Sequence, residues 1–140
     1  MKIAILGAME PEVKAYGHMH KHGHEVYVGY TGVGKTAAAM NTQRVISEFK
    51  PDAIIFSGVG GALELGLEIG ELGIVDAAID CEMDVQSWDK SYQRGEIPFT
   101  HERVFRSDKK LIDLAIEASE DTFDAYSATG SQFLDAESKY

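Results

Sequence analysis

This chain of 140 residues contains almost no cysteine and no long apolar run. The single cysteine, Cys81, excludes an internal disulfide and is typical of a protein from a reducing compartment. The first residues, MKIAILGAMEPEV, contain a short apolar run that two glutamates follow, which is unlike a signal peptide. No stretch approaches the length of a membrane span. The sequence therefore predicts a cytoplasmic protein with no membrane partner.

Positive charge is also scarce. Lysine and arginine number 13 against 23 aspartates and glutamates, so the formal net charge is −10 at pH 7. A charge of this sign repels the phosphates of nucleic acids and the surface of anionic membranes. We therefore expect no nucleic-acid partner.

What remains is the composition of an ordinary globular domain. Apolar residues make up 44% of the chain and charged residues 26%, which excludes a disordered or a fibrous protein. A chain of 140 residues is long enough for one hydrophobic core. With no internal repeat and no linker, we expect a single domain over residues 1–140.

Strand-like runs alternate with helical patterns along the chain. The runs at residues 2–6, 25–30, 52–56, 72–79 and 124–129 predict strands. Apolar residues at helical spacing predict helices over residues 36–49 and from an N-cap at Ser107 to about residue 120. This order predicts an α/β fold, a three-layer sandwich whose central twisted sheet is mostly parallel or mixed. Ligands of such sheets bind at the carboxyl ends of the strands.

Residues 29–36 (GYTGVGKT) match the phosphate-binding pattern G-x-x-x-x-G-K-[ST]. In a nucleotide triphosphatase Lys35 would reach the terminal phosphates, Thr36 would hold Mg²⁺, and Asp76 would be a candidate for the second acidic ligand. However, the loop follows the second strand rather than the first, and four positions of the pattern are free. A P-loop nucleotide-binding protein therefore remains an alternative.

Four histidines alternate in the segment 17–24: His18, His20, His22 and His24. On an extended backbone their imidazoles would share one face, where they would suit Zn²⁺ or Ni²⁺. An exposed polar loop explains the same pattern, and His101 lies too far along the chain to add a ligand. We expect no metal site, although the sequence leaves this question open.

Three further candidates follow expected strands. Glu10 and Glu12 come after the first strand, where a carboxylate can act as a general acid or base, although acidic residues also favour a helix start. The glycine-rich segment at residues 57–61 lets backbone approach a ligand but lacks the third glycine of a dinucleotide fingerprint. Phe133 is placed either to stack on a base or to fill core space.

The order of the motifs is more specific than any one of them. MKIAILGAMEPEV, TGVGKTAAA, PDAIIFSGVGGAL, ELGIVDAAIDCEMDV and ATGSQFL follow one another along nearly the whole chain. Together they resemble the nucleoside phosphorylase and nucleosidase superfamily, and within it the 5′-methylthioadenosine/S-adenosylhomocysteine nucleosidases. The resemblance implies hydrolysis of the N-glycosidic bond of 5′-substituted adenosines, without a cofactor. It also explains the TGVGK turn without a nucleoside triphosphate.

The resemblance assigns roles to particular residues. Glu12 is the carboxylate that activates the attacking water, and Met9 lies beside the ribose. The loop that lines the ribose and purine corresponds to Ser57, Gly58, Val59, Gly60 and Gly61.

It also assigns residues to the two ends of the substrate. Phe133 and Leu134 correspond to the pair that stacks on adenine and clamps it. Val85, Trp88 and Pro98 correspond more loosely to the pocket for the 5′-alkylthio group, part of which the neighbouring subunit supplies in family dimers. A homodimer is therefore expected.

The loop after the first strand favours water over phosphate as the nucleophile. Phosphorylases of this superfamily bind phosphate there through an arginine, whereas this chain has Gly-Ala-Met-Glu-Pro-Glu. Two carboxylates would repel phosphate. The expected reaction passes through an oxocarbenium-like ribosyl transition state with Glu12 as the general base.

The chain is shorter than the family in two places. Between Val13 and Thr31 a strand or hairpin is missing, and the first helix is expected to be absent or replaced by the histidine-bearing loop. The chain also ends at Tyr140, before a Met-Glu motif that binds the ribose hydroxyls and a Ser-Asp motif whose aspartate protonates the purine. Loss of a general acid commonly lowers rates by about 10²–10⁴. Whether the chain is an enzyme is therefore uncertain, and a non-catalytic nucleoside-binding remnant is the alternative.

Overall fold

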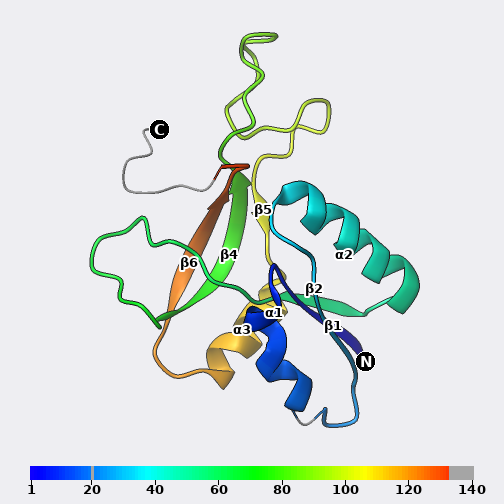
Figure 1. Ribbon diagram of the computed structural model, residues 1–140. Helices are drawn as coiled ribbons and strands as arrows, with labels where there is room; N and C mark the ends of the chain where they lie inside the picture. The colour runs from blue at the N-terminus through cyan, green and yellow to red at the C-terminus, as the bar shows by residue number, and fades with distance from the viewer. Residues whose placement is uncertain (20, 133–140) are drawn as a thin grey trace. The chain divides into compact units, whose positions relative to one another are not determined.

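The computed structural model describes residues 1–19 and 21–132, and the chain divides into two compact units at residues 63 and 64. Each unit contains a three-stranded sheet (Figure 1). The predicted α/β class is confirmed, with parallel pairing in three of the four strand pairs. No helix in the described part of the chain is long and apolar enough to cross a membrane.

The first unit is built on a parallel sheet in the order β2-β1-β3. Its strands are β1 (Lys2–Gly7), β2 (Glu25–Tyr30) and β3 (Ala53–Phe56), close to the predicted ranges. The central strand β1 is the most buried because both of its edges are paired. Its alternate residues Ala4 and Leu6 pack with Val45 of helix α2 (Lys35–Phe49). This packing anchors the carboxyl ends of three parallel strands beside one another.

A short helical segment follows β1. It begins with α1 (Glu10–Val13), a single turn with Pro11 in its first turn, and continues as the 3₁₀ helix η1 (Lys14–His18). Val13 is 3% exposed. A Cβ added to Gly7 would lie 2.8 Å from Val13 Cγ1, so Val13 packs against this end of β1. The first helix is therefore present, although it is short.

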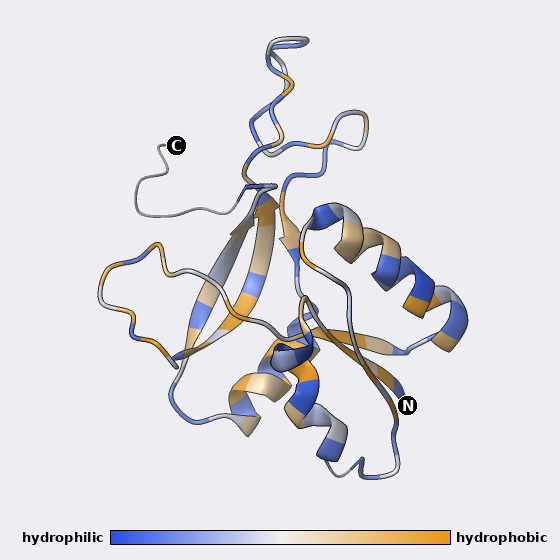
Figure 2. Cartoon of the chain, viewed as in Figure 1, coloured by the Kyte–Doolittle hydropathy of each residue, from blue (hydrophilic) through white to orange (hydrophobic). Residues whose placement is uncertain are grey.

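The second unit has the strand order β5-β4-β6. Strands β4 (Leu72–Asp80) and β6 (Thr122–Thr129) are parallel, with a β-bulge between Val75 and Ala77. Strand β5 (Phe105–Arg106) pairs antiparallel with β4 and was not predicted, because two residues carry no periodic signal. Figure 2 shows β3 and β4 mostly in the hydrophobic colour, while α2 changes between hydrophilic and hydrophobic along its length.

Helix α3 (Lys109–Ala118) begins one residue later than predicted. Its N-cap is Asp108, whose Oδ1 accepts the N–H of Leu111 at 3.1 Å. The prediction of Ser107 as N-cap is wrong because the Ser107 hydroxyl donates to the Val75 carbonyl at 2.6 Å instead. Ser107 therefore joins the start of α3 to the bulge in β4.

Candidate active site

The carboxyl ends of β1, β2 and β3 meet through backbone hydrogen bonds. The Thr31 N–H donates to the Gly7 carbonyl at 2.8 Å, and the Ser57 N–H donates to the Leu6 carbonyl at 2.8 Å. A Cβ on Gly7 would lie 2.8 Å from the Ser57 carbonyl oxygen, so the contact requires glycine. Three loops therefore leave the sheet next to one another, as expected for a ligand site in a parallel sheet.

Glu12 lies at this junction. Its Oε2 accepts the N–H groups of Ala8 and Met9, each at 2.7 Å, and its Oε1 accepts the N–H of Val59 at 3.0 Å. The bond to Met9, the N-cap of α1, is the usual bond of an N3 glutamate in a capping box. Capping does not explain the bond to Val59, which is 47 residues away in the chain. The predicted residues Met9, Glu12 and Val59 are therefore in contact.

The hydrogen bonds leave room for one more proton donor. An ionised carboxylate offers about four acceptor positions. Within the described residues Glu12 uses three of them, two on Oε2 and one on Oε1. Charge-assisted bonds to backbone N–H groups also hold the carboxylate in one orientation. A water molecule can therefore donate to Oε1 of a carboxylate that is already oriented.

The glycine-rich segment after β3 approaches this carboxylate closely. A Cβ on Gly58 would lie 3.1 Å from Glu12 Oε1 and 3.1 Å from Phe56 Cε1, closer than most side-chain contacts. Ser57 Oγ lies 2.9 Å from the Tyr16 hydroxyl, which fixes the start of the segment. Sequence reasoning missed Tyr16, because Tyr16 and Ser57 are 41 positions apart in the chain and no local pattern links them.

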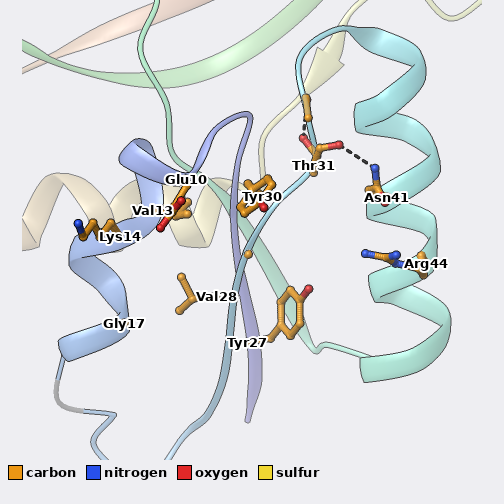
Figure 3. Close-up of a pocket in the computed structure, with 12 residues that line it drawn as sticks. Glu10, Val13, Lys14, Gly17, Tyr27, Val28, Tyr30, Thr31, Asn41 and Arg44 are labelled. Atoms are coloured by element: carbon orange, nitrogen blue, oxygen red, sulfur yellow. Dashed lines mark hydrogen bonds between the residues drawn. The ribbon is translucent and has the colours of Figure 1, made fainter.

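Thr31 is a second residue that sequence reasoning did not assign. It is 3% exposed, and its hydroxyl donates to the Gly7 carbonyl at 3.1 Å. Asn41 of α2 donates to the Thr31 carbonyl at 2.7 Å, as Figure 3 shows. These bonds fix the TGVGK turn to β1 and α2. The threonine before the glycines is visible in the sequence, but its carbonyl partner on Gly7 follows only from the pairing of β1 with β2.

The first unit also contains a hollow of about 720 Å³ along β2 (Figure 3). Its lining includes Lys14 and Glu10 on one side of β2 and Arg44 of α2 on the other. It reaches Thr31 and Gly32, but neither Glu12 nor Ser57 lines it. We therefore place the candidate chemistry at the Glu12 junction, where the hydrogen bonds converge, and not in this hollow.

The histidine segment does not have the extended backbone that a shared face requires. His18 ends the 3₁₀ helix η1, and His22 lies in a turn with a φ of 44°. The His24 N–H donates to the Lys21 carbonyl at 2.7 Å and closes that turn. Among residues 1–19 and 21–132 no group of three or more histidine, cysteine or acidic side chains is arranged to hold a metal ion. His20 lies outside the described residues.

The second unit gathers part of the predicted alkylthio region. The Trp88 N–H donates to the Val85 carbonyl at 2.9 Å. The Trp88 ring lies 5.7 Å from the ring of Phe99, the residue after Pro98. It also stacks on buried Tyr92, with 5.9 Å between ring centroids. Trp88 therefore lies beside Val85 and beside the residue that follows Pro98, in the segment between β4 and β5.

His101 extends this aromatic group. Its ring stacks on Tyr92 at 5.3 Å, and its Nδ1 lies 2.7 Å from Glu96 Oε1. The Gln93 N–H and then the His101 side chain lower the pKa of Glu96 below its ordinary value. The pKa of Asp89, beside Trp88, is lowered by hydrogen bonds from the backbone and side chain of Ser91. Phe133 and Leu134, the predicted adenine pair, lie outside the described residues.

Comparison with known proteins identifies the family. The family model of the phosphorylase superfamily matches residues 14–133. This chain belongs to the phosphorylase superfamily. Because the matched range includes the TGVGK turn, that turn is explained by the superfamily, and the P-loop interpretation is set aside.

Individual members of the superfamily are similar over nearly the whole chain. The 5′-methylthioadenosine/S-adenosylhomocysteine nucleosidase of Haemophilus influenzae (strain PittEE) is 31% identical in an alignment of 160 positions that covers 99% of this chain and 69% of that protein. The crystal structure of the nucleosidase of that name from Neisseria meningitidis, in complex with methylthio-immucillin-A, is 25% identical with a TM-score of 0.88. That match covers 97% of this chain and 67% of the solved chain.

A second solved structure shows likeness of the fold alone. A mutant of the futalosine hydrolase of Helicobacter pylori strain 26695 is 24% identical, with a TM-score of 0.85, and the match covers 97% of this chain and 71% of that chain. This chain thus spans about two thirds of the length of its relatives. The resemblance read from the motif order is confirmed.

Proposed function

We propose that this superfamily member hydrolyses the N-glycosidic bond of methylthioadenosine and S-adenosylhomocysteine and releases adenine. The two nucleosidases reported above carry these substrates in their names. The observation that carries the proposal is the Glu12 carboxylate, which three backbone N–H groups hold with one acceptor position left. That arrangement is suited to a general base.

In the proposed reaction Oε1 of Glu12 accepts a proton from water as the water oxygen attacks the anomeric carbon of the ribose. The electron pair of the breaking C–N bond goes to adenine, which takes up a proton from solvent as it leaves, and the proton on Glu12 then returns to solvent. General-base assistance typically contributes about 10²–10⁴ in rate. Orientation of the carboxylate before the substrate arrives lowers the entropic cost of this step.

Water is the proposed nucleophile because the junction is acidic. Glu10 and Glu12 lie within three residues of each other on α1, directly after β1. A phosphate dianion beside Glu12 would be repelled by the negative carboxylate rather than attracted by a cation. The reaction should therefore proceed without phosphate.

Further substrate contacts are proposed from the family resemblance. Met9 would lie beside the ribose, and the segment from Ser57 to Gly60 would line the nucleoside. Val85 and Trp88 would contact the 5′ substituent. The base would be held by Phe133 and Leu134.

The proposal is tested by adenine release from methylthioadenosine in buffer free of phosphate. Glu12→Gln keeps the size of the side chain but removes its basicity, so kcat should fall by about 10²–10⁴. Glu10→Gln is the matched control, because it removes a carboxylate two residues away on the same helix, and it should retain activity. Absence of adenine release by the wild-type chain, or a requirement for phosphate, would overturn the proposal. Binding of methylthioadenosine without release would favour the non-catalytic alternative.

We also propose that the protein is a cytoplasmic homodimer that uses no cofactor. The lone cysteine is consistent with a reducing compartment, and the resemblance implies a dimer. Light scattering after size-exclusion chromatography tests the oligomeric state, with a mass near twice 15.3 kDa expected.

A further inference from the structure

A second carboxylate, Glu82, binds the loop that follows β6. The N–H groups of Ser131 and Gln132 both donate to it, the second to Oε1 at 3.2 Å. These donors lie 49 and 50 residues from Glu82 along the chain. The bonds therefore tie the loop after β4 to the loop after β6, at the ends of two paired parallel strands.

The turn that carries Glu82 is itself fixed. Asp80 Oδ1 accepts the N–H groups of Glu82 at 3.0 Å and Met83 at 3.1 Å. Cys81 donates its N–H to the Thr129 carbonyl at 2.9 Å and its thiol to the same oxygen at 3.1 Å. The Glu82 side chain thus extends from a turn that is itself hydrogen-bonded to the end of β6.

Gly130 allows the carboxylate to lie directly against the backbone. A Cβ on Gly130 would lie 2.7 Å from both Cδ and Oε1 of Glu82. Any larger residue would displace the carboxylate from the two N–H groups beyond it. The strand pair does not depend on this contact, because eight residue pairs hold β4 and β6 in register. Glu82 therefore fixes the loop and not the sheet.

We propose that Glu82 is a positioning residue for the segment that binds the purine base, an inference that rests on the proposed function. Ser131 and Gln132 immediately precede Phe133 and Leu134. Two charge-assisted bonds orient the peptide groups from which that pair continues. A loop ordered before the base arrives loses less conformational freedom on binding. Glu82 acts through the loop and does not touch the substrate.

The test compares Glu82→Gln with the wild type in adenine release from methylthioadenosine. The amide keeps the shape of the side chain but loses its charge and one acceptor oxygen, so we expect KM to rise about tenfold. The change in kcat should stay within about twofold, because ground state and transition state lose the same contact to the base. Glu117→Gln, which removes an exposed carboxylate from α3, is the control and should leave both constants unchanged.

Hydrogen exchange of the backbone provides a readout that does not require turnover. In Glu82→Gln the amides of Ser131 and Gln132 should exchange faster, while those of β4 and β6 stay protected. If Glu82→Gln does not fold, Glu82→Asp takes its place in the test. The aspartate retains the charge on a side chain shorter by one methylene, so KM should rise by a few-fold.

The outcomes separate the two proposals. An active wild type with an unchanged KM in Glu82→Gln, or with kcat lowered and KM unchanged, overturns the positioning role alone. A wild type that releases no adenine overturns the proposed function, and the positioning role with it. Faster exchange of the two amides together with a raised KM supports the proposal.

Discussion

In each unit a glutamate links the ends of two paired parallel strands by accepting backbone N–H groups. The donors of these hydrogen bonds differ between the two units. In the first unit Glu12 receives N–H groups from the loop after β1, at Ala8 and Met9, and from the loop after β3, at Val59. In the second unit Glu82 receives two consecutive N–H groups, Ser131 and Gln132, from the loop after β6. Glu12 thus accepts N–H groups from its own loop and from a second loop, whereas the two N–H groups that Ser131 and Gln132 donate to Glu82 are neighbours in one loop.

This difference separates a chemical role from a positioning role. A carboxylate that draws donors from two loops is held at the opening between them, where a ligand of a parallel sheet binds. A carboxylate that binds two successive N–H groups of one loop sets the direction of that loop. In the two proposals, the same kind of hydrogen bond orients a reacting group in one unit and a positioning residue in the other.

Shortening each carboxylate by one methylene should give the largest difference between the two glutamates. Glu12→Asp withdraws the base by about 1.5 Å, the length of one C–C bond. Because a misplacement of about 1 Å can cost about 10²-fold, kcat should fall about 100-fold with a small change in KM. Glu82→Asp should instead raise KM a few-fold and leave kcat within about twofold. Steady-state adenine release measures both, and an equal loss of kcat in the two variants would refute the division of roles.

The sequence predicted a role for Glu12 but not for Glu82, and the reason is physical. Glu12 belongs to a compact motif, GAMEPEV, in which a strand end, a proline-started turn and the acid are adjacent. Glu82 follows a strand without any local pattern, and its donors are about 50 residues away. Even for Glu12 the bond to Val59 was not predictable, because it depends on the pairing of β1 with β3.

The fold was predictable where periodicity is long enough to detect. Strands β1 to β4 and helix α2 lie close to their predicted ranges because apolar alternation and helical spacing specify them. Strand β5 exists only because Phe105 and Arg106 pair with β4. The choice of Asp108 over Ser107 as the cap of α3 likewise depends on the Val75 carbonyl, a tertiary partner.

Alanine at the glycine beside each carboxylate should give a smaller effect on the kinetics, in kcat for one glutamate and in KM for the other. At Gly58 the new methyl would lie 3.1 Å from Glu12 Oε1, so the base must shift by a few tenths of an ångström, and kcat should fall about tenfold. At Gly130 it would lie 2.7 Å from Glu82 Oε1, so the carboxylate must move away and KM should rise several-fold.

Gly17→Ala is the matched control for both glycine variants, since its methyl would meet nothing within 4 Å. Kinetics and thermal melting should be measured on all three variants. A fall in kcat for Gly130→Ala that equals the fall for Gly58→Ala would contradict separate roles for the two carboxylates.

The smallest expected effect concerns Glu96, a carboxylate that also accepts a backbone N–H, but from a residue only three positions away in the chain. Its Oε2 accepts the Gln93 N–H at 2.8 Å, and this bond, with that of His101, lowers its pKa in the folded state. Because the folded pKa lies below the unfolded value of about 4.3, the contribution to stability is complete above that value. It is lost as the pH falls through the folded pKa.

Trp88, the only tryptophan, reports on this loss because it stacks on Tyr92, which stacks on His101. Between about pH 5 and pH 3 its emission should change slightly in the wild type and less in Glu96→Gln. Asp89, whose pKa is also lowered, titrates beside the indole, so Asp89→Asn is the control for a direct effect. If the Trp88 emission changes equally with pH in the wild type and in Glu96→Gln, protonation of Glu96 does not alter the surroundings of the indole. Of the three glutamates, only Glu12 and Glu82, whose hydrogen bonds link the ends of two strands, would then be expected to have a measurable effect.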